Sequence, residues 1–85
     1  MSLEVRYTRS FIEDLKTLEP VAYQRVYDFV FIKFSQINYL QELPEIKQLG
    51  NSAIFYRFTV DNYMIGIEVT GQIIKFIRIL PKPEI

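Results

Sequence analysis

The composition of this 85-residue chain excludes most of the usual catalytic and metal-binding chemistry. It contains no cysteine and no histidine, so it has no disulfide, no thiolate metal site and no Ser-His or Cys-His nucleophile pair. Ten Lys and Arg residues balance ten Asp and Glu residues, and a net charge of zero argues against the broad basic field of a typical nucleic-acid binder. A local basic face is compatible with this balance.

The chain shows no sign of a second domain or of a membrane segment. No stretch approaches the roughly 20 consecutive apolar residues of a membrane span. The N-terminal sequence MSLEVRYTRS lacks the apolar region of a secretory signal. No repeat, low-complexity tract or flexible linker interrupts the sequence. We therefore expect one domain over residues 1–85, located in the cytoplasm and without a membrane contact.

The first half of the chain predicts one strand followed by two helices. Residues 3–8 alternate apolar and polar side chains, which is typical of a half-buried strand. Ser10 and Glu13 have the spacing of a capping box, which begins a helix. Pro20 fits the first position of a second helix over residues 21–37, because its missing N–H needs no partner there.

The second predicted helix carries more apolar side chains than one sheet can cover. Its continuous apolar stripe consists of Tyr23, Tyr27, Val30, Phe34 and Ile37. Outside that stripe lie Val26, Phe29, Phe31 and Ile32. A helix that is apolar over so much of its circumference packs on more than one neighbour. We therefore expect it to contact the first helix, and we expect the protein to self-associate or to bind a partner helix.

The second half of the chain predicts a loop and three strands. Residues 38–52 are rich in loop formers, with a short helical turn in LPEIKQL. Strands follow at residues 53–60, 63–69 and 73–80, joined by tight hairpin turns. The expected fold class is α+β, in the order β-α-α-β-β-β. Its four-stranded, largely antiparallel sheet has the first strand beside the last and two helices packed on one face.

The sheet face that the helices leave open carries Arg57, in a strand that is otherwise almost wholly apolar or aromatic. Alternation places Arg57 on the opposite side from Tyr56 and Phe58. The residues expected beside it are Thr59, Met64 and Glu68, with either Lys75 or Arg78. Taken alone, this set fits a solvated face with a cross-strand ion pair better than it fits a site.

Four segments of the chain carry a family resemblance. They are FIEDLKTL in the first helix, LPEIKQLGN before the sheet, YRFTVDNYMIGIEV across the hairpin and FIRILPKPEI at the end. The chain resembles the RelE/ParE superfamily of toxins from bacterial type II toxin–antitoxin systems over essentially its whole length, most specifically over residues 46–80. The resemblance implies a RelE-like fold and a cognate antitoxin that binds through an amphipathic segment. In the RelE-like branch it also implies a ribosome-dependent endonuclease that cuts mRNA without a metal ion or cofactor.

The resemblance also implies which residues act. In such enzymes a 2′-hydroxyl attacks the adjacent phosphate, and basic groups stabilise the charge on its oxygens. Arginine suits this role because its planar fork matches two phosphate oxygens. The resemblance points to Arg57 as the phosphate-stabilising group, assisted by Lys82 and by Lys47 or Arg78. Glu68 is a candidate base, but we expect it to be a structural partner of Arg57.

Departures from the family pattern predict a depleted catalytic set. Met64 and Thr59 stand where many relatives carry basic residues, and Pro81-Lys82-Pro83 replaces a basic pair. Loss of one charge stabiliser commonly lowers the rate about 100- to 1,000-fold. We therefore expect weak mRNA cleavage. Two alternatives remain open: a ParE-like inhibitor of DNA gyrase, which needs no nuclease site, and a catalytically inactive protein that binds an antitoxin.

Overall fold

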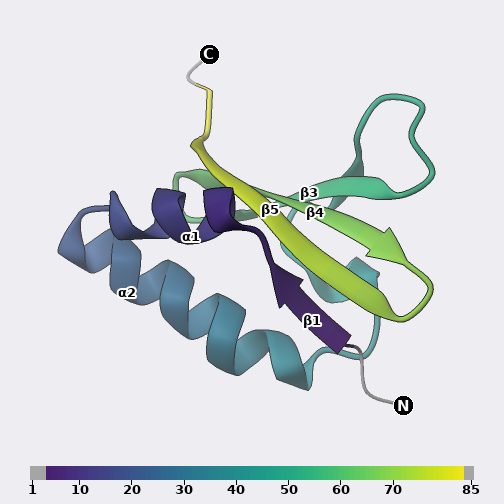
Figure 1. The fold of residues 1–85 in the computed structure, drawn as a ribbon, viewed down its shortest axis with the longest axis horizontal. Helices are drawn as coiled ribbons and strands as arrows, with labels where there is room; N and C mark the ends of the chain where they lie inside the picture. The colour runs from purple at the N-terminus through teal and green to yellow at the C-terminus, as the bar shows by residue number, and fades with distance from the viewer. Residues whose placement is uncertain (1–3, 84–85) are drawn as a thin grey trace.

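A five-stranded sheet with helices packed on one face forms the protein, and the computed structural model describes residues 4–83 (Figure 1). The strands span Glu4–Tyr7 (β1), Lys47–Gln48 (β2), Phe55–Val60 (β3), Tyr63–Thr70 (β4) and Ile73–Pro81 (β5). They lie in the order β1-β5-β4-β3-β2, with β1 parallel to β5 and the other pairs antiparallel. This arrangement confirms the α+β class and the place of the first strand beside the last. Leu3, the expected start of that strand, lies outside the described residues.

The short strand β2 is the one departure from the expected sheet. Residues 47 and 48, expected in a loop, pair instead with β3, where Lys47 opposes Arg57 and Gln48 opposes Tyr56. The prediction of four strands was therefore wrong by one. A two-residue strand is too short to show alternation, and neighbouring Pro and Gly residues mask it.

Thr8 caps the first helix where the backbone leaves β1. Its hydroxyl accepts a hydrogen bond from the Phe11 N–H at 3.0 Å and donates to the Ile77 carbonyl at 2.8 Å. The predicted capping box of Ser10 and Glu13 is wrong, because the helix begins before Ser10. Thr8 therefore has two functions, since it ends the parallel strand and also ties the helix to β5.

The two helices lie together on one side of the sheet (Figure 1). Helix α1 spans Arg9–Lys16, and α2 spans Pro20–Asp28 and continues through a π-helical turn at Phe29–Lys33 and a 3₁₀ turn at Phe34–Gln36. As predicted, Pro20 is the first helical residue of α2. The wider π turn changes which side chains share a face, because regular α-helical spacing does not hold across it.

The observed burial also corrects the predicted stripe of the second helix. Tyr23 and Tyr27, expected to be buried, are exposed, whereas Val26, expected outside the stripe, is only 1% exposed. The buried side of the helix is a run of residues four apart: Val26, Val30 and Phe34. Most of the apolar side chains that lay outside the predicted stripe therefore pack in or against the core. Self-association stays a prediction that now rests on the exposed tyrosines and a few exposed aliphatic side chains.

The hydrophobic core fills the space between the helices and the inner sheet face. Phe58 and Phe76 lie at its centre with ring centroids 6.3 Å apart in an edge-to-face arrangement. The buried apolar residues are Phe11, Leu15, Val26, Val30, Phe34, Leu43, Phe58, Ile65, Ile67, Ile74, Phe76 and Ile79. Because this core and the helices lie on one side of the sheet, the helices leave the other face open (Figure 1).

A bulge in β5 places two cations on the open face where strict alternation allows one. Glu68 opposes Lys75 and Gly66 opposes Arg78, with one extra residue of β5, Ile77, between these pairs. An inserted residue reverses the sheet face to which each later side chain of the strand points. Lys75 and Arg78 therefore both join the open face.

Asp14 fastens α1 to the end of β5. Its carboxylate accepts hydrogen bonds from the Arg78 side chain at 2.7 and 3.2 Å and from the Ile79 N–H at 2.9 Å. Burial raises the pKa of this carboxyl, but the bonds from Arg78 and Ile79 outweigh burial and hold the pKa below its usual value. An acidic residue near a helix C-terminus opposes the helix dipole, so this contact with the sheet explains its position.

We expect Asp14→Asn to lower the free energy of unfolding by about 1–3 kcal/mol at neutral pH, because two donors lose a charged acceptor. A lowered folded-state pKa contributes stability above the unfolded pKa and loses it as the pH falls through the folded pKa. The difference between parent and variant should therefore vanish in acid. Urea unfolding at both pH values measures it, with the surface variant Asp28→Asn as control. Equal losses in the two variants would contradict the assignment.

Candidate active site

Three cations from separate segments line one cleft of about 240 Å³ on the open sheet face. Arg57 comes from β3, Lys47 from β2 and Lys82 from the segment after β5. Lys47 opposes Arg57 directly, and the Lys82 N–H donates to the Asn62 carbonyl at 2.7 Å, which fixes Lys82 beside the β3–β4 turn. The structure thus brings together three of the four predicted site residues. We name this site the cationic cleft; its lining is Glu45, Lys47, Arg57, Thr59, Met64, Lys82 and Pro83.

The Arg57 guanidinium is free to bind an anion. Among residues 4–83, no carboxylate lies within ion-pair distance of it. One of its Nη atoms donates to the Met64 sulfur at 3.0 Å, and a thioether is a weak acceptor. The expected pairing of Arg57 with Glu68 is wrong: Glu68 lies 3.5 Å from the Lys75 Nζ, because these two residues oppose each other across β4 and β5.

One carboxylate, Glu45, enters the cationic cleft, and it was not among the residues predicted from sequence. Its backbone has φ 52°, a left-handed conformation that is uncommon for a residue other than glycine. Its two carboxylate oxygens accept from the Lys82 Nζ at 3.2 and 3.3 Å. The hydrogen bond from Lys82 holds the pKa of Glu45 below its usual value. No strand pattern predicts its place, because Glu45 precedes β2 and its backbone is not extended.

We expect Lys82→Ala to raise the pKa of Glu45 toward its ordinary value, because the ammonium group is the main stabiliser of this carboxylate. An NMR titration of the Glu45 carboxyl carbon in parent and variant measures the change. Lys75→Ala removes the cation bonded to Glu68 instead and should leave the Glu45 titration unchanged. A Glu45 pKa that does not move in Lys82→Ala would show that the ion pair is absent in solution.

Arg78, the fourth predicted site residue, lies outside the cationic cleft. Its Nε is 2.7 Å from Asp14, and this hydrogen bond raises the pKa of the guanidinium further. Across the sheet it opposes Gly66 on β4, which separates it from Arg57, whereas Lys47 lies on the other side of Arg57. Its donors are therefore engaged in holding α1 to the sheet rather than directed at the cleft.

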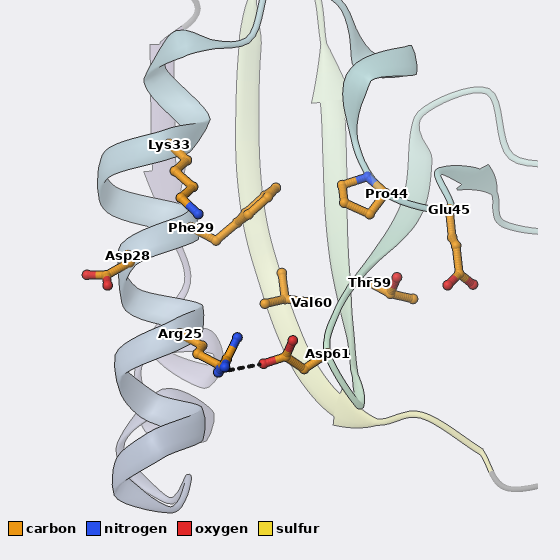
Figure 2. A pocket seen from close by; sticks show the side chains of 9 residues that line it. All are labelled: Arg25, Asp28, Phe29, Lys33, Pro44, Glu45, Thr59, Val60 and Asp61. Carbon is orange, nitrogen blue, oxygen red and sulfur yellow. Dashed lines mark ion pairs between the residues drawn. The ribbon is translucent and has the colours of Figure 1, made fainter.

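A larger cavity of about 570 Å³ lies between α2 and the β3–β4 turn, and Figure 2 shows the side chains that line it. Arg25 and Asp61 face each other across it with Nε and carboxylate oxygen 3.3 Å apart. Its charged lining residues are Arg25, Asp28, Lys33, Glu45 and Asp61. Three carboxylates against two cations disfavour a phosphate ligand there. Charge rather than size therefore identifies the cationic cleft as the candidate site.

Among the described residues, neither a metal-binding cluster nor a membrane-spanning helix is found. Within residues 4–83, no group of three or more carboxylates is arranged to hold a metal ion. None of the helices in that range has the length and apolarity needed to cross a membrane. The charged groups that the cationic cleft does present are three cations and one carboxylate.

Comparison with known proteins gives matches over nearly the whole chain, although no protein-family model matches it. It is 32% identical over 84 residues to the protein named Toxin RelE3 from Methanocaldococcus jannaschii, covering 98% of this chain and 94% of that one. A chain of the RelB–RelE antitoxin–toxin complex from Methanococcus jannaschii is also 32% identical, with a TM-score of 0.74 over 89% of this chain and 88% of that one.

A third similarity concerns the fold alone. A chain of the chromosomal ParDE system from P. aeruginosa has a TM-score of 0.66 at 17% identity, covering 95% of this chain and 97% of that one. The fold is therefore shared by both branches of the superfamily, whereas the higher sequence identity lies with RelE. The region aligned with Toxin RelE3 covers 98% of this chain and so includes both the helices and the open sheet face. The resemblance seen in the sequence is confirmed, and the chain belongs to the RelE family of toxins within the RelE/ParE superfamily.

Proposed function

We propose that this protein is the toxin of a type II toxin–antitoxin pair and that its cationic cleft cleaves mRNA on the ribosome without a metal ion. The observation that carries the proposal is the Arg57 guanidinium, which has no carboxylate partner among residues 4–83 and shares one cleft with Lys47 and Lys82. Matched relatives named as toxins support the class. The proposed action on translating ribosomes implies a cytoplasmic location.

The groups in the cleft fit cleavage by the RNA's own 2′-hydroxyl. The 2′-oxygen attacks the adjacent phosphorus and the bond to the 5′-oxygen breaks, which gives a 2′,3′-cyclic phosphate and a free 5′-hydroxyl. Arg57 and Lys47 stabilise the charge that grows on the non-bridging oxygens. Glu45, whose carboxylate is stabilised by the hydrogen bond from Lys82, accepts the proton of the 2′-hydroxyl. Lys82 donates a proton to the 5′-oxygen.

The ion pair between Glu45 and Lys82 gives this proposed cycle a way to close. After cleavage Glu45 carries one proton and Lys82 lacks one. The two side chains are hydrogen bonded at 3.2 Å, so a proton moves from Glu45 back to Lys82 without a further group. The resting charges of both residues are thereby restored.

The same cleft explains why we expect slow cleavage. Met64 and Thr59, which stand where many relatives carry basic residues, both line it. The Thr59 N–H donates to the Pro44 carbonyl at 3.0 Å, and Thr59 is only 9% exposed. Neither side chain can stabilise an anionic phosphate as a cation does. Induced expression should therefore inhibit growth weakly.

We also propose that the antitoxin binds the helical side of the molecule through an amphipathic segment. Helix α2 and the π turn that follows it expose large apolar side chains there: Val21 at 70%, Tyr23 at 36%, Tyr27 at 39% and Ile32 at 52%. The Tyr23 and Tyr27 rings are 5.8 Å apart and continue to Phe31, 4.7 Å from Tyr27. An aromatic row of this kind suits the apolar face of a partner helix. The matched RelB–RelE complex supports a partner of this class.

Primer extension on mRNA in a purified translation system tests the nuclease. Cuts in phase with the codon in the parent, reduced in Arg57→Ala, are the expected result. Growth arrest with intact mRNA and inhibited DNA gyrase would contradict it and assign the protein to the ParE branch. Antitoxin binding without growth arrest or cleavage would assign it to the inactive members.

A further inference from the structure

An apolar hollow of about 300 Å³ adjoins the cationic cleft on the open sheet face. Arg57 and Met64 line both spaces, so the hollow begins beside the guanidinium that faces the cleft. Leu49 and Leu80 are 40% and 46% exposed at its rim. Its apolar lining includes Leu49, Phe55, Met64, Gly66, Ile77 and Leu80.

Gly66 creates the depth of this hollow. It opposes Arg57 on β3 and Arg78 on β5, so it lies between two arginines at the same level of the sheet. A Cβ at this position would meet none of the described atoms within 4 Å. Glycine weakens a strand interior and often marks a place where a ligand approaches the backbone closely. The space above Gly66 is therefore open to a flat group lying on the sheet.

We propose that the hollow binds the nucleobase next to the scissile phosphate while Arg57 holds that phosphate. This inference rests on the proposed nuclease function. A base offers an apolar face that stacks on aromatic rings and on arginine planes, and Phe55, Arg57 and Arg78 provide these around the hollow. The lining has few hydrogen-bond donors or acceptors that could distinguish the edges of the bases. The hollow therefore discriminates by size and prefers purines to pyrimidines.

Charge favours a nucleobase over the aliphatic side chain of a protein partner. Two arginines flank the hollow, and the unpaired one, Arg57, is shared with the cationic cleft, where Lys47 and Lys82 also lie. A nucleotide supplies both an apolar face and an adjacent phosphate, which matches the two adjoining spaces. An aliphatic side chain fills the hollow but leaves Arg57 without an anion.

Gly66→Val tests the proposal because it fills the hollow without removing a cation. Valine is favoured in strands, and no described atom blocks its Cβ, so the fold should persist. The probe is a 2′-O-methyl trinucleotide, which lacks the attacking hydroxyl, compared with versions that are abasic at one position. We expect the parent to bind the intact probe about tenfold more tightly than the abasic probe. In Gly66→Val this difference should disappear, while affinity for the abasic probe stays as in the parent.

The Met64 methyl group reports the site directly. With ¹³C-methyl methionine, its NMR signal should shift on addition of the intact probe, because a bound base places its ring current over the hollow. The abasic probe should shift it much less. Should Gly66→Val unfold, Gly66→Ala fills less of the space and should give a partial loss of the affinity difference.

Equal affinity of parent and Gly66→Val for the intact probe would overturn the proposal. Loss of antitoxin binding in Gly66→Val with unchanged probe affinity would also overturn it and assign the hollow to a protein partner. These outcomes are separable from failure of the nuclease function. Probe binding in the hollow of a parent that cuts no mRNA would refute the nuclease and support the base site. Identical cleavage by parent and Gly66→Val would refute the base site alone.

Discussion

Arg57→Ala should reduce codon-phased mRNA cleavage by about 100- to 1,000-fold, the usual effect of removing one preorganised charge stabiliser. Arg57 has no carboxylate partner among the described residues, so its charge is available to a phosphate and is not neutralised by an ion pair within the protein. Its removal leaves Lys47 and Lys82, and Lys82 is already bonded to Glu45. The measurement is single-turnover cleavage of a programmed ribosome complex followed by primer extension.

Arg25→Ala is the matched control for this variant. It removes the same charge from the cavity between α2 and the β3–β4 turn, where carboxylates outnumber cations (Figure 2). Arg25 forms an exposed ion pair with Asp61, and such pairs contribute little to stability. We expect its cleavage rate to match that of the parent. Cleavage that persists in Arg57→Ala, or falls equally in both variants, would show that the cationic cleft is not the catalytic site.

The sheet and the open face could be predicted because their determinants are local. Alternation along residues 53–60 assigns Arg57 to the side away from Phe58, and Phe58 is fully buried in the structure. Turn-forming residues fix the hairpins, and Asp61 does adopt a positive φ. These features depend on side-chain period and on backbone preference, both of which are visible in short stretches of sequence.

The composition of the cleft could not be predicted in the same way, because it depends on distant segments and on irregular backbone. Lys47 meets Arg57 through a two-residue strand that shows no pattern of its own. Glu45 reaches the cleft because its backbone is left-handed, and neither glutamate nor the preceding proline favours that conformation. The bulge at Ile77 decides that Lys75 and Arg78 share a face. Each of these depends on what the rest of the fold presents, and only coordinates reveal it.

Arg78 shows how a residue predicted for the site can instead hold two elements of the fold together. The sequence left open whether Lys75 or Arg78 lies on the open face; the bulge places both there, yet the Arg78 guanidinium bonds Asp14 on α1. The Ile79 N–H, which has no strand partner beyond the end of β1, donates to the same carboxylate. A buried backbone donor needs such an acceptor. Arg78 and the Ile79 N–H thus share the Asp14 carboxylate at the edge of the sheet, and Arg78 is not directed at the cationic cleft.

Met64→Arg should raise cleavage by about 10- to 100-fold, because it adds a charge stabiliser where the cleft lacks one. Met64 opposes Thr59 on β3, and its sulfur lies 3.0 Å from an Arg57 Nη, so a guanidinium there shares a phosphate with Arg57. Without RNA the two like charges repel, and a bound phosphate relieves that repulsion. Activity should therefore become more salt-dependent, with a slope steeper by about one counterion.

Met64→Gln separates the effect of charge from that of shape, since glutamine is similar in length and neutral. It should leave both the single-turnover rate and its salt dependence close to those of the parent. An equal rise in Met64→Gln would mean that the gain comes from reshaping the adjoining hollow, which Met64 also lines. No rise in Met64→Arg, with the fold intact, would show that the missing cation does not limit the rate. Another step would then limit the rate, and the candidate within the cationic cleft is proton transfer by Glu45 and Lys82, which the substitution does not touch.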